Sequence, residues 1–319
     1  MKIFLLCSTL LAATSVAGEN SVVRTTLILV EGAAGEADYG TKFQHQTDSW
    51  QKAAGQAGAE ILTLPTVSPE AKPGENDRSR LEKILTDIPK EGPAPLWIIL
   101  IGHGTWDGKE ARFNLEGPDL AATDLATWLR PFKRPLTVIN TSSSSAPFIP
   151  LLAGPNRTIV TATRSGNERN YARFGDNLAL TLTDPAADYD QDGSVSVLEW
   201  FLRASSLTAG FYQADGRLLT EHALIDDNGD GKGTPSEWFR GLRATSKAKD
   251  NTPVDGSYAQ RTFLTPDTAT QTMTPAQLGR RDEWEAKISA LRLQKSALPE
   301  AEYYQKLEDL LRKLAELYP

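Results

Sequence analysis

Twelve residues in the second half of the chain have the types and spacing of a cation-binding loop. The stretch "DYDQDGSVSVLE" (188–199) has oxygen-bearing groups at its first, third, fifth, seventh, ninth and twelfth positions, which are Asp188, Asp190, Asp192, Ser194, Ser196 and Glu199. Gly193 stands at the sixth, where an EF-hand loop turns sharply. Ca²⁺ takes six to eight oxygens, and this loop offers carboxylates, the Ser194 carbonyl and a potentially bidentate Glu199. We therefore expect this loop to bind Ca²⁺.

A second stretch, 226–237, repeats the pattern less completely. Its candidate ligand positions are Asp226, Asn228, Asp230, Lys232, Thr234 and Glu237, with Gly231 at the turn. Lys232 adds a positive charge, and Gly233 stands where an apolar residue usually pairs two such loops. We expect weaker calcium binding here, or an acidic turn without an ion. Helical segments around Trp200–Phe201 and Trp238–Phe239 are expected to follow the two loops.

Two further places could carry acid–base or nucleophilic chemistry. In "IGHGTWDG", His103 lies between two glycines at the end of an apolar run, where an imidazole could act as a general base beside unencumbered backbone N–H groups. In "VINTSSSSAP", four serines follow the next apolar run. A serine becomes a nucleophile only with a base and an oxyanion site; otherwise the run is a polar turn that satisfies backbone groups.

The elements that position these residues alternate along the chain. Short apolar runs at 25–30, 60–65, 95–102, 135–140 and 157–165 read as strands, and amphipathic segments at 42–59, 77–88 and 119–129 read as helices. This rhythm predicts an α/β fold with a mostly parallel sheet covered on both faces. Functional groups then gather beyond the carboxyl ends of the strands, where His103 and the serines are expected.

The C-terminal part has a different character. Residues 248–273 are rich in Thr, Asp, Pro and Gln and read as a linker. Residues 274–319 read as a helical hairpin, because Trp284, Ile288 and Leu291 recur at helical spacing, and so do the leucines from Leu307 to Leu317. Such a pair could serve only its own packing or dock a protein partner.

Composition limits the possible functions. The chain has 319 residues and a formal net charge of −7, with no general basic face, so nucleic acid is not an expected partner. Residues 1–17 read as a signal peptide, too short to span a membrane, which predicts an exported protein that is periplasmic or secreted. The single cysteine, Cys7, lies in that segment. We therefore expect the mature protein to have no disulfide and no thiolate chemistry.

Across roughly 25–237 the chain resembles the legumain family of caspase-like peptidases. The resemblance rests on the His103-Gly104 pair, the polar run after the next strand, and "FQHQTDSW" after the first strand. It implies a caspase-like three-layer α/β/α domain, here 22–247 including both calcium loops. It also implies a catalytic His103 and a Gly104 N–H that contributes to the oxyanion hole.

The sequence departs from this family at the nucleophile. The family's cysteine corresponds to Ser142 in an ungapped match, or to Ser143 if the family's downstream Ser-Gly is matched to Ser145-Ala146. The specificity arginine corresponds to Gln44 and an acidic residue to Asn140. These departures argue against a legumain-like preference for asparagine. Because a hydroxyl is far less ionised than a thiol, serine would need a well-oriented base, and Asp107 is a candidate to orient His103.

These observations predict an exported calcium-binding protein with a caspase/legumain-like domain that is a weak or inactive peptidase. Its partners would be calcium ions and a peptide or protein. The alternative is an active serine-dependent hydrolase that uses Ser142 or Ser143 as nucleophile and His103 as base.

Overall fold

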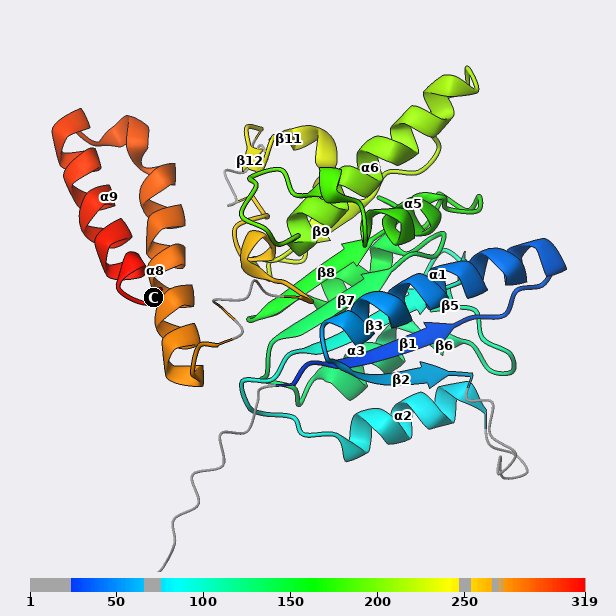
Figure 1. Ribbon diagram of the computed structural model, residues 1–319. Coiled ribbons are helices and arrows are strands. Elements are labelled where there is room, and N and C mark those ends of the chain that lie inside the picture. Colours follow the sequence, from blue (N-terminus) through cyan, green and yellow to red (C-terminus); the bar gives the residue numbers. More distant parts are fainter. Residues whose placement is uncertain (1–23, 66–75, 247–253, 266–269, 271, 319) are drawn as a thin grey trace, which may run out of the picture.

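A seven-stranded sheet forms the centre of the computed structural model, which describes residues 24–65, 76–246, 254–265, 270 and 272–318 (Figure 1). The predicted signal peptide lies outside the described residues. The strands, in spatial order, are β10 (Thr234–Pro235), β9 (Leu224–Asp226), β8 (Arg157–Thr161), β7 (Leu136–Asn140), β3 (Leu96–Ile101), β1 (Thr26–Glu31) and β2 (Glu60–Leu64). The five strands from β8 to β2 are parallel, whereas β9 and β10 are antiparallel additions at one edge.

Helices cover both faces of this sheet. One face carries α1 (Ala37–Gln56), α5 (Phe174–Thr181) and α6 (Val197–Ala214), and the other carries α2 (Asp77–Asp87), α3 (Ala122–Leu129) and the short α4 (Ile149–Leu152). Strands buried on two sides need apolar residues at nearly every position, and β3, "LWIILI", is buried throughout. The predicted three-layer α/β/α class with a mostly parallel sheet is confirmed.

A cluster of tryptophans fixes the helix that follows the first acidic loop. Trp200 on α6 packs edge to face against Trp50 on α1 and Trp97 on β3, with ring centroids 5.6 and 6.1 Å apart. All three side chains are buried. Aromatic pairs of this kind contribute about 0.5–1.5 kcal/mol each beyond the area that they bury. The exit of the loop is thus anchored to the centre of the sheet.

A small three-stranded sheet follows β3 directly. Its strands β4 (Gly104–Trp106), β5 (Ala111–Phe113) and β6 (Leu120–Ala121) are antiparallel. Gly104 is both the first residue of β4 and the partner of Phe113, so the chain just after His103 is held in a regular hairpin.

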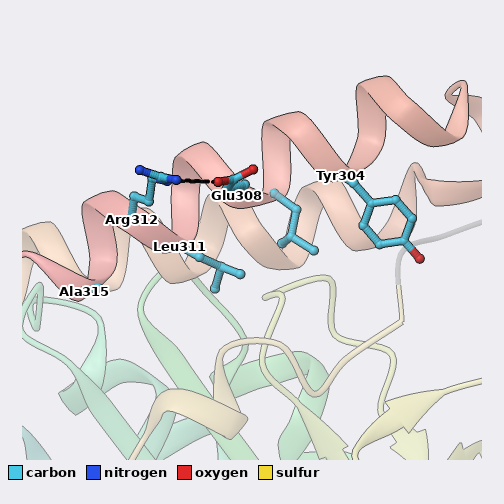
Figure 2. Close-up of a pocket in the computed structure, with 6 residues that line it drawn as sticks. Tyr304, Glu308, Leu311, Arg312 and Ala315 are labelled. Carbon is cyan, nitrogen blue, oxygen red and sulfur yellow. Dashed lines mark hydrogen bonds and ion pairs between the residues drawn. The ribbon is translucent and has the colours of Figure 1, made fainter.

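The C-terminal helices α8 (Pro275–Leu293) and α9 (Glu300–Ala315) form an antiparallel pair at one side of the molecule (Figure 1). Ile288, Leu291 and Tyr303 are buried. Figure 2 shows a groove on α9, whose six lining residues include Tyr304, Leu311 and the ion-paired Glu308 and Arg312. None of the residues that the sequence singles out for chemistry lines this groove.

Part of the segment assigned to a linker is packed into the domain. Asp255, Ala259 and Leu264 are buried, and Val197 N donates to Thr262 O at 2.9 Å. At least one polar residue of this segment has a structural role, because Asp255 accepts hydrogen bonds from the backbone N–H groups of Asp227 and Asn228 in the second acidic loop.

Candidate functional site

The histidine and the serine run lie at the same edge of the sheet. Strands β3 and β7 are adjacent and parallel, with Leu100 opposite Asn140. His103-Gly104 and residues 141–145 therefore leave the sheet side by side, as the order of the strands predicted.

Contact between the two segments is made through Gly104. The Ser143 hydroxyl donates to Gly104 O at 3.1 Å and accepts from Gly104 N at 3.3 Å. A Cβ atom at Gly104 would lie 2.2 Å from Ser143 O, so only glycine allows this approach. In this arrangement the N–H proposed for an oxyanion hole is directed at a serine hydroxyl.

The Ser142 hydroxyl is buried and faces a neutral amide. It donates to Asn140 Oδ1 at 2.6 Å, and the Ser142 N–H binds the same oxygen at 3.0 Å. The side chain has no solvent exposure. The Asn140 amide oxygen is thus the acceptor for the Ser142 hydroxyl. An amide oxygen cannot take up the serine proton at neutral pH.

The other two serines shape the turn. Ser144 has a φ of 54°, in the left-handed region, and its N–H donates to Glu168 O at 2.9 Å. Ser145 Oγ accepts from Ala162 N at 3.1 Å and lies 3.2 Å from Thr163 Oγ1. These contacts are those expected of a polar turn that satisfies backbone groups at strand ends.

His103 lies among aromatic rings. Its ring centroid is 4.6 Å from that of Tyr39, 5.2 Å from that of Phe43 and 6.0 Å from that of Tyr171. Burial lowers the pKa of His103, and the Ala34 backbone and the Glu36 carboxylate only partly oppose this effect. Within the described residues, no hydrogen bond joins the imidazole to Ser142 or Ser143. The lowered pKa favours the neutral imidazole that a base requires, but among the described residues His103 lacks the serine contact that a dyad requires.

Asp107 does not orient His103. Its carboxylate accepts from the N–H groups of Lys109 and Glu110, both at 2.9 Å, and pairs with Arg112 at 2.9 Å. These bonds lower the pKa of Asp107 to about 2. The sequence suggested Asp107 because it is near His103 in the chain, but its side chain closes the β4–β5 turn instead.

Sequence reasoning missed a polar cluster beside the serine turn. Asp176 Oδ1 accepts from Gln46 Nε2 and from the Tyr171 hydroxyl, both at 2.7 Å. The adjacent Gly175 lies against Thr141, where an added Cβ would come within 2.8 Å of the threonine Cβ. Gln46 belongs to the "FQHQTDSW" stretch, which was the only sequence signal for this cluster. Gln44, in contrast, is exposed and bonds Asp48.

The first acidic loop gathers its carboxylates as the spacing predicts. Ligand atoms of Asp188, Asp190 and Asp192 lie within 4.8 Å of one another. Asp188 accepts from the N–H groups of Asp192 and Gly193, and Gly193 has a φ of 88°. Burial, with repulsion from neighbouring carboxylates, raises the pKa of Asp192 to about 6. A divalent cation would relieve this repulsion.

Glu199 closes this loop from α6. Its Oε1 accepts from Tyr189 N at 2.9 Å, and its Oε2 accepts from both Ser196 N and Ser196 Oγ at 2.8 Å. Ser196 in turn caps α6 by accepting from Glu199 N. The Ser196 hydroxyl is therefore used in a capping box, and Ser194 is buried. The twelfth-position carboxylate is buried and bonded to Tyr189 and Ser196, so it joins the loop to the start of α6.

The second acidic loop departs from the pattern in its last third. The loop runs directly into a 3₁₀ turn at Ser236–Trp238 rather than an α-helix, and the chain continues as β11 (Phe239–Arg240), paired with β12 (Arg243–Ala244). Glu237 is exposed. Thr234 Oγ1 donates to Asp255 Oδ2 at 2.6 Å. The expected helix around Trp238–Phe239 is thus wrong, because this segment pairs as a strand after its turn.

Comparison with known proteins gives similarity in structure only. No protein-family model matches the chain, and no curated protein matches it in sequence. The Drosophila initiator caspase Dronc is 10% identical with a TM-score of 0.44, covering 66% of this chain and 82% of that one. Caspase-1 from Spodoptera frugiperda is 11% identical with a TM-score of 0.40, covering 64% of this chain and 86% of that one. Protein GSU0716 from Geobacter sulfurreducens is 12% identical with a TM-score of 0.38, covering 57% of this chain and 89% of that one.

Proposed function

We propose that this chain is an exported calcium-binding protein whose caspase/legumain-like domain has weak or no peptidase activity. The observation that carries the calcium assignment is the approach of Asp188, Asp190 and Asp192 within 4.8 Å, in a loop with the twelve-position spacing. Bound Ca²⁺ would supply a divalent charge that offsets three neighbouring carboxylates and ties the loop to α6 through Glu199. Export rests on residues 1–17. Among the helices of the described residues, none combines the length and the hydropathy that a membrane span requires.

The serine contacts support weak or absent catalysis. Ser142 donates to Asn140 and Ser143 to Gly104 O, so neither hydroxyl is directed at the imidazole of His103. A serine without a positioned base is a poor nucleophile, because its hydroxyl remains protonated at neutral pH. We infer a role in binding a peptide or protein in place of catalysis.

Calorimetric titration of the mature chain with Ca²⁺ tests the calcium assignment. We expect saturable binding and a rise in melting temperature in Ca²⁺, because a ligand that binds only the folded state stabilises it. Asp188→Ala should remove the first-loop site. Asp215→Ala is the matched control, since Asp215 is an exposed acid outside the loop that pairs with Arg217. Equal titrations of wild type and Asp188→Ala would refute the first-loop site.

A serine-dependent hydrolase is the second candidate, favoured by the placement of His103-Gly104 and the serines at one sheet edge. Incubation with a fluorophosphonate probe distinguishes the two. The proposal of weak or absent peptidase activity predicts no labelling of Ser142 or Ser143. Labelling of either serine that disappears in His103→Ala would establish the hydrolase instead.

A further inference from the structure

The second acidic loop contains a buried carboxylate oxygen without a protein partner. Asp226 ends β9 and has no solvent exposure. Its Oδ1 accepts from Gly229 N at 3.0 Å, which turns the carboxylate toward the interior of the loop. Its Oδ2 is buried and accepts no hydrogen bond within the described part of the chain. A buried acceptor without a partner lowers the stability of the folded state. We therefore expect a hydrogen-bond donor, a water molecule or a cation to contact Asp226 Oδ2.

The surroundings of Asp226 are acidic as well. Asp227 and Asp255 are 7% and 3% exposed, and Asp227 Oδ1 is a second buried oxygen without a partner in the described residues. No ion pair to any of these three aspartates is formed among the described residues. A cation bound at Asp226 would offset the negative charge of this region, because burying carboxylates without a compensating charge is strongly unfavourable.

The start of the loop is shaped to receive such an ion. Asn228 Oδ1 accepts from Asp230 N at 2.9 Å, and Asp230 Oδ1 accepts from Lys232 N at 2.8 Å. The same bond pattern is present in the first loop, where Asp192 Oδ1 accepts from Ser194 N at 2.8 Å. These short-range bonds set the spacing of the side chains at the first, third and fifth positions.

The end of the loop is closed differently from an EF-hand. Asp255 Oδ1 accepts from Asp227 N and Asn228 N, and its Oδ2 binds Thr234. Asp227 Oδ2 accepts from Tyr258 N and Ala259 N, both at 2.7 Å. The segment around 255–259 thus holds the loop in shape, which is the task that the twelfth-position glutamate performs elsewhere. Glu237 is exposed and makes no such contact with the residues that the structure describes.

We propose that the second loop binds a hard divalent cation through Asp226, Asn228 and Asp230, with Glu237 taking no part. With three side chains as ligands, the remaining positions would be filled by backbone oxygens and water, as hard cations allow. This site shares the class of ion with the proposed function, but it stands on different residues, so either loop can fail without the other.

Calorimetric titration with Ca²⁺, repeated with Mg²⁺, tests this site on the full mature chain. Wild type should bind two Ca²⁺ ions, and Asp188→Ala should retain one. Asp226→Asn should lose the second-loop ion. The exposed Asp230→Asn, which leaves the buried region intact, should weaken that ion's affinity at least tenfold even if Asp226→Asn fails to fold. Glu237→Gln should bind both ions with affinities within twofold of wild type.

The outcomes separate the two loops. Binding that Asp188→Ala abolishes completely, or that Asp230→Asn leaves unchanged, overturns the second-loop site. Loss of an ion in Glu237→Gln would also overturn the proposal, because it would show that Glu237 is a ligand, as in an ordinary EF-hand. If the wild type binds one ion, and Asp188→Ala retains that binding while Asp230→Asn weakens it, the second-loop site is supported and the first-loop site is rejected.

Discussion

The Ser143 hydroxyl binds both backbone groups of Gly104, at 3.1 Å from its carbonyl oxygen and 3.3 Å from its nitrogen. This contact joins the histidine segment to the serine turn without using the imidazole. At this edge of the sheet Gly104 packs against the backbone of Ser143. The side chain of His103 lies beside the rings of Tyr39 and Phe43 instead.

Gly104→Ala should destabilise the domain. The added Cβ would lie 2.2 Å from Ser143 O and 2.7 Å from Ser142 Oγ, so the serine turn would have to move. Forced overpacking of this kind typically costs about 1–3 kcal/mol. Urea unfolding should show a fall of that size in the free energy of unfolding. Gly210→Ala is the control: Gly210 lies in α6 with open space around it, and alanine there should be neutral or stabilising by up to about 1 kcal/mol.

The positions within the serine run should respond differently to substitution. Ser144 has a positive φ, which glycine adopts without steric cost, and its buried hydroxyl has no partner among the described residues. We therefore expect Ser144→Gly to leave the free energy of unfolding unchanged or slightly higher. Ser145→Ala removes one of the two acceptors of Ala162 N, which also donates to Asn140 O at 3.0 Å, and should cost about 0.5–1.5 kcal/mol. If Ser144→Gly were instead the more damaging change in thermal melts, the interpretation of the run as a turn would be wrong.

His103 should titrate below the ordinary histidine value of about 6.5. Burial disfavours the imidazolium, so the folded-state pKa lies below the unfolded one. The stability from this group is therefore present above the unfolded pKa and is lost as the pH falls through the folded pKa. Proton NMR of the imidazole as a function of pH measures this shift.

Opening the aromatic surroundings should reverse the shift. Tyr39→Ala removes the ring nearest His103 and should raise the pKa of the imidazole toward 6.5. Tyr304→Ala, on the exposed face of α9, is the matched control and should leave the titration unchanged. A His103 pKa at or above 6.5 in the wild type would show that the ring is solvated or paired with an acid.

Substitutions of two acidic residues in the first loop should distinguish a role in stability from a role in Ca²⁺ binding. Glu199→Gln should lower the free energy of unfolding by about 1–3 kcal/mol even in EDTA, because Glu199 accepts from Tyr189 N and Ser196. Asp190→Asn should leave stability in EDTA unchanged or slightly higher, since Asp190 is exposed, makes no side-chain hydrogen bond within the described residues and repels Asp192 when no ion is bound. Both should weaken Ca²⁺ binding in calorimetry. Equal stability of the two variants in EDTA would contradict the structural role of Glu199.

Local pattern alone determined much of this protein. Apolar runs such as 95–102 have no polar face, which requires strands covered on both sides, and β3 is buried at every position. The spacing of Asp188, Asp190 and Asp192 acts over a few residues through turn geometry, so the sequence already brings their ligand atoms together. For the same reason the helix after this loop begins at the capping pair Ser196 and Glu199.

Tertiary structure decided the partners of those residues. Asp255 reaches Thr234 from 21 positions away, and Asp176 reaches Gln46 from 130, distances along the chain at which no periodicity carries information. Proximity in sequence misled for Asp107, which pairs with Arg112, because a tight turn satisfies its carboxylate before His103 can. Hydrogen-bond partners depend on which strand ends meet and on which donors burial leaves unsatisfied, and only the assembled sheet fixes both.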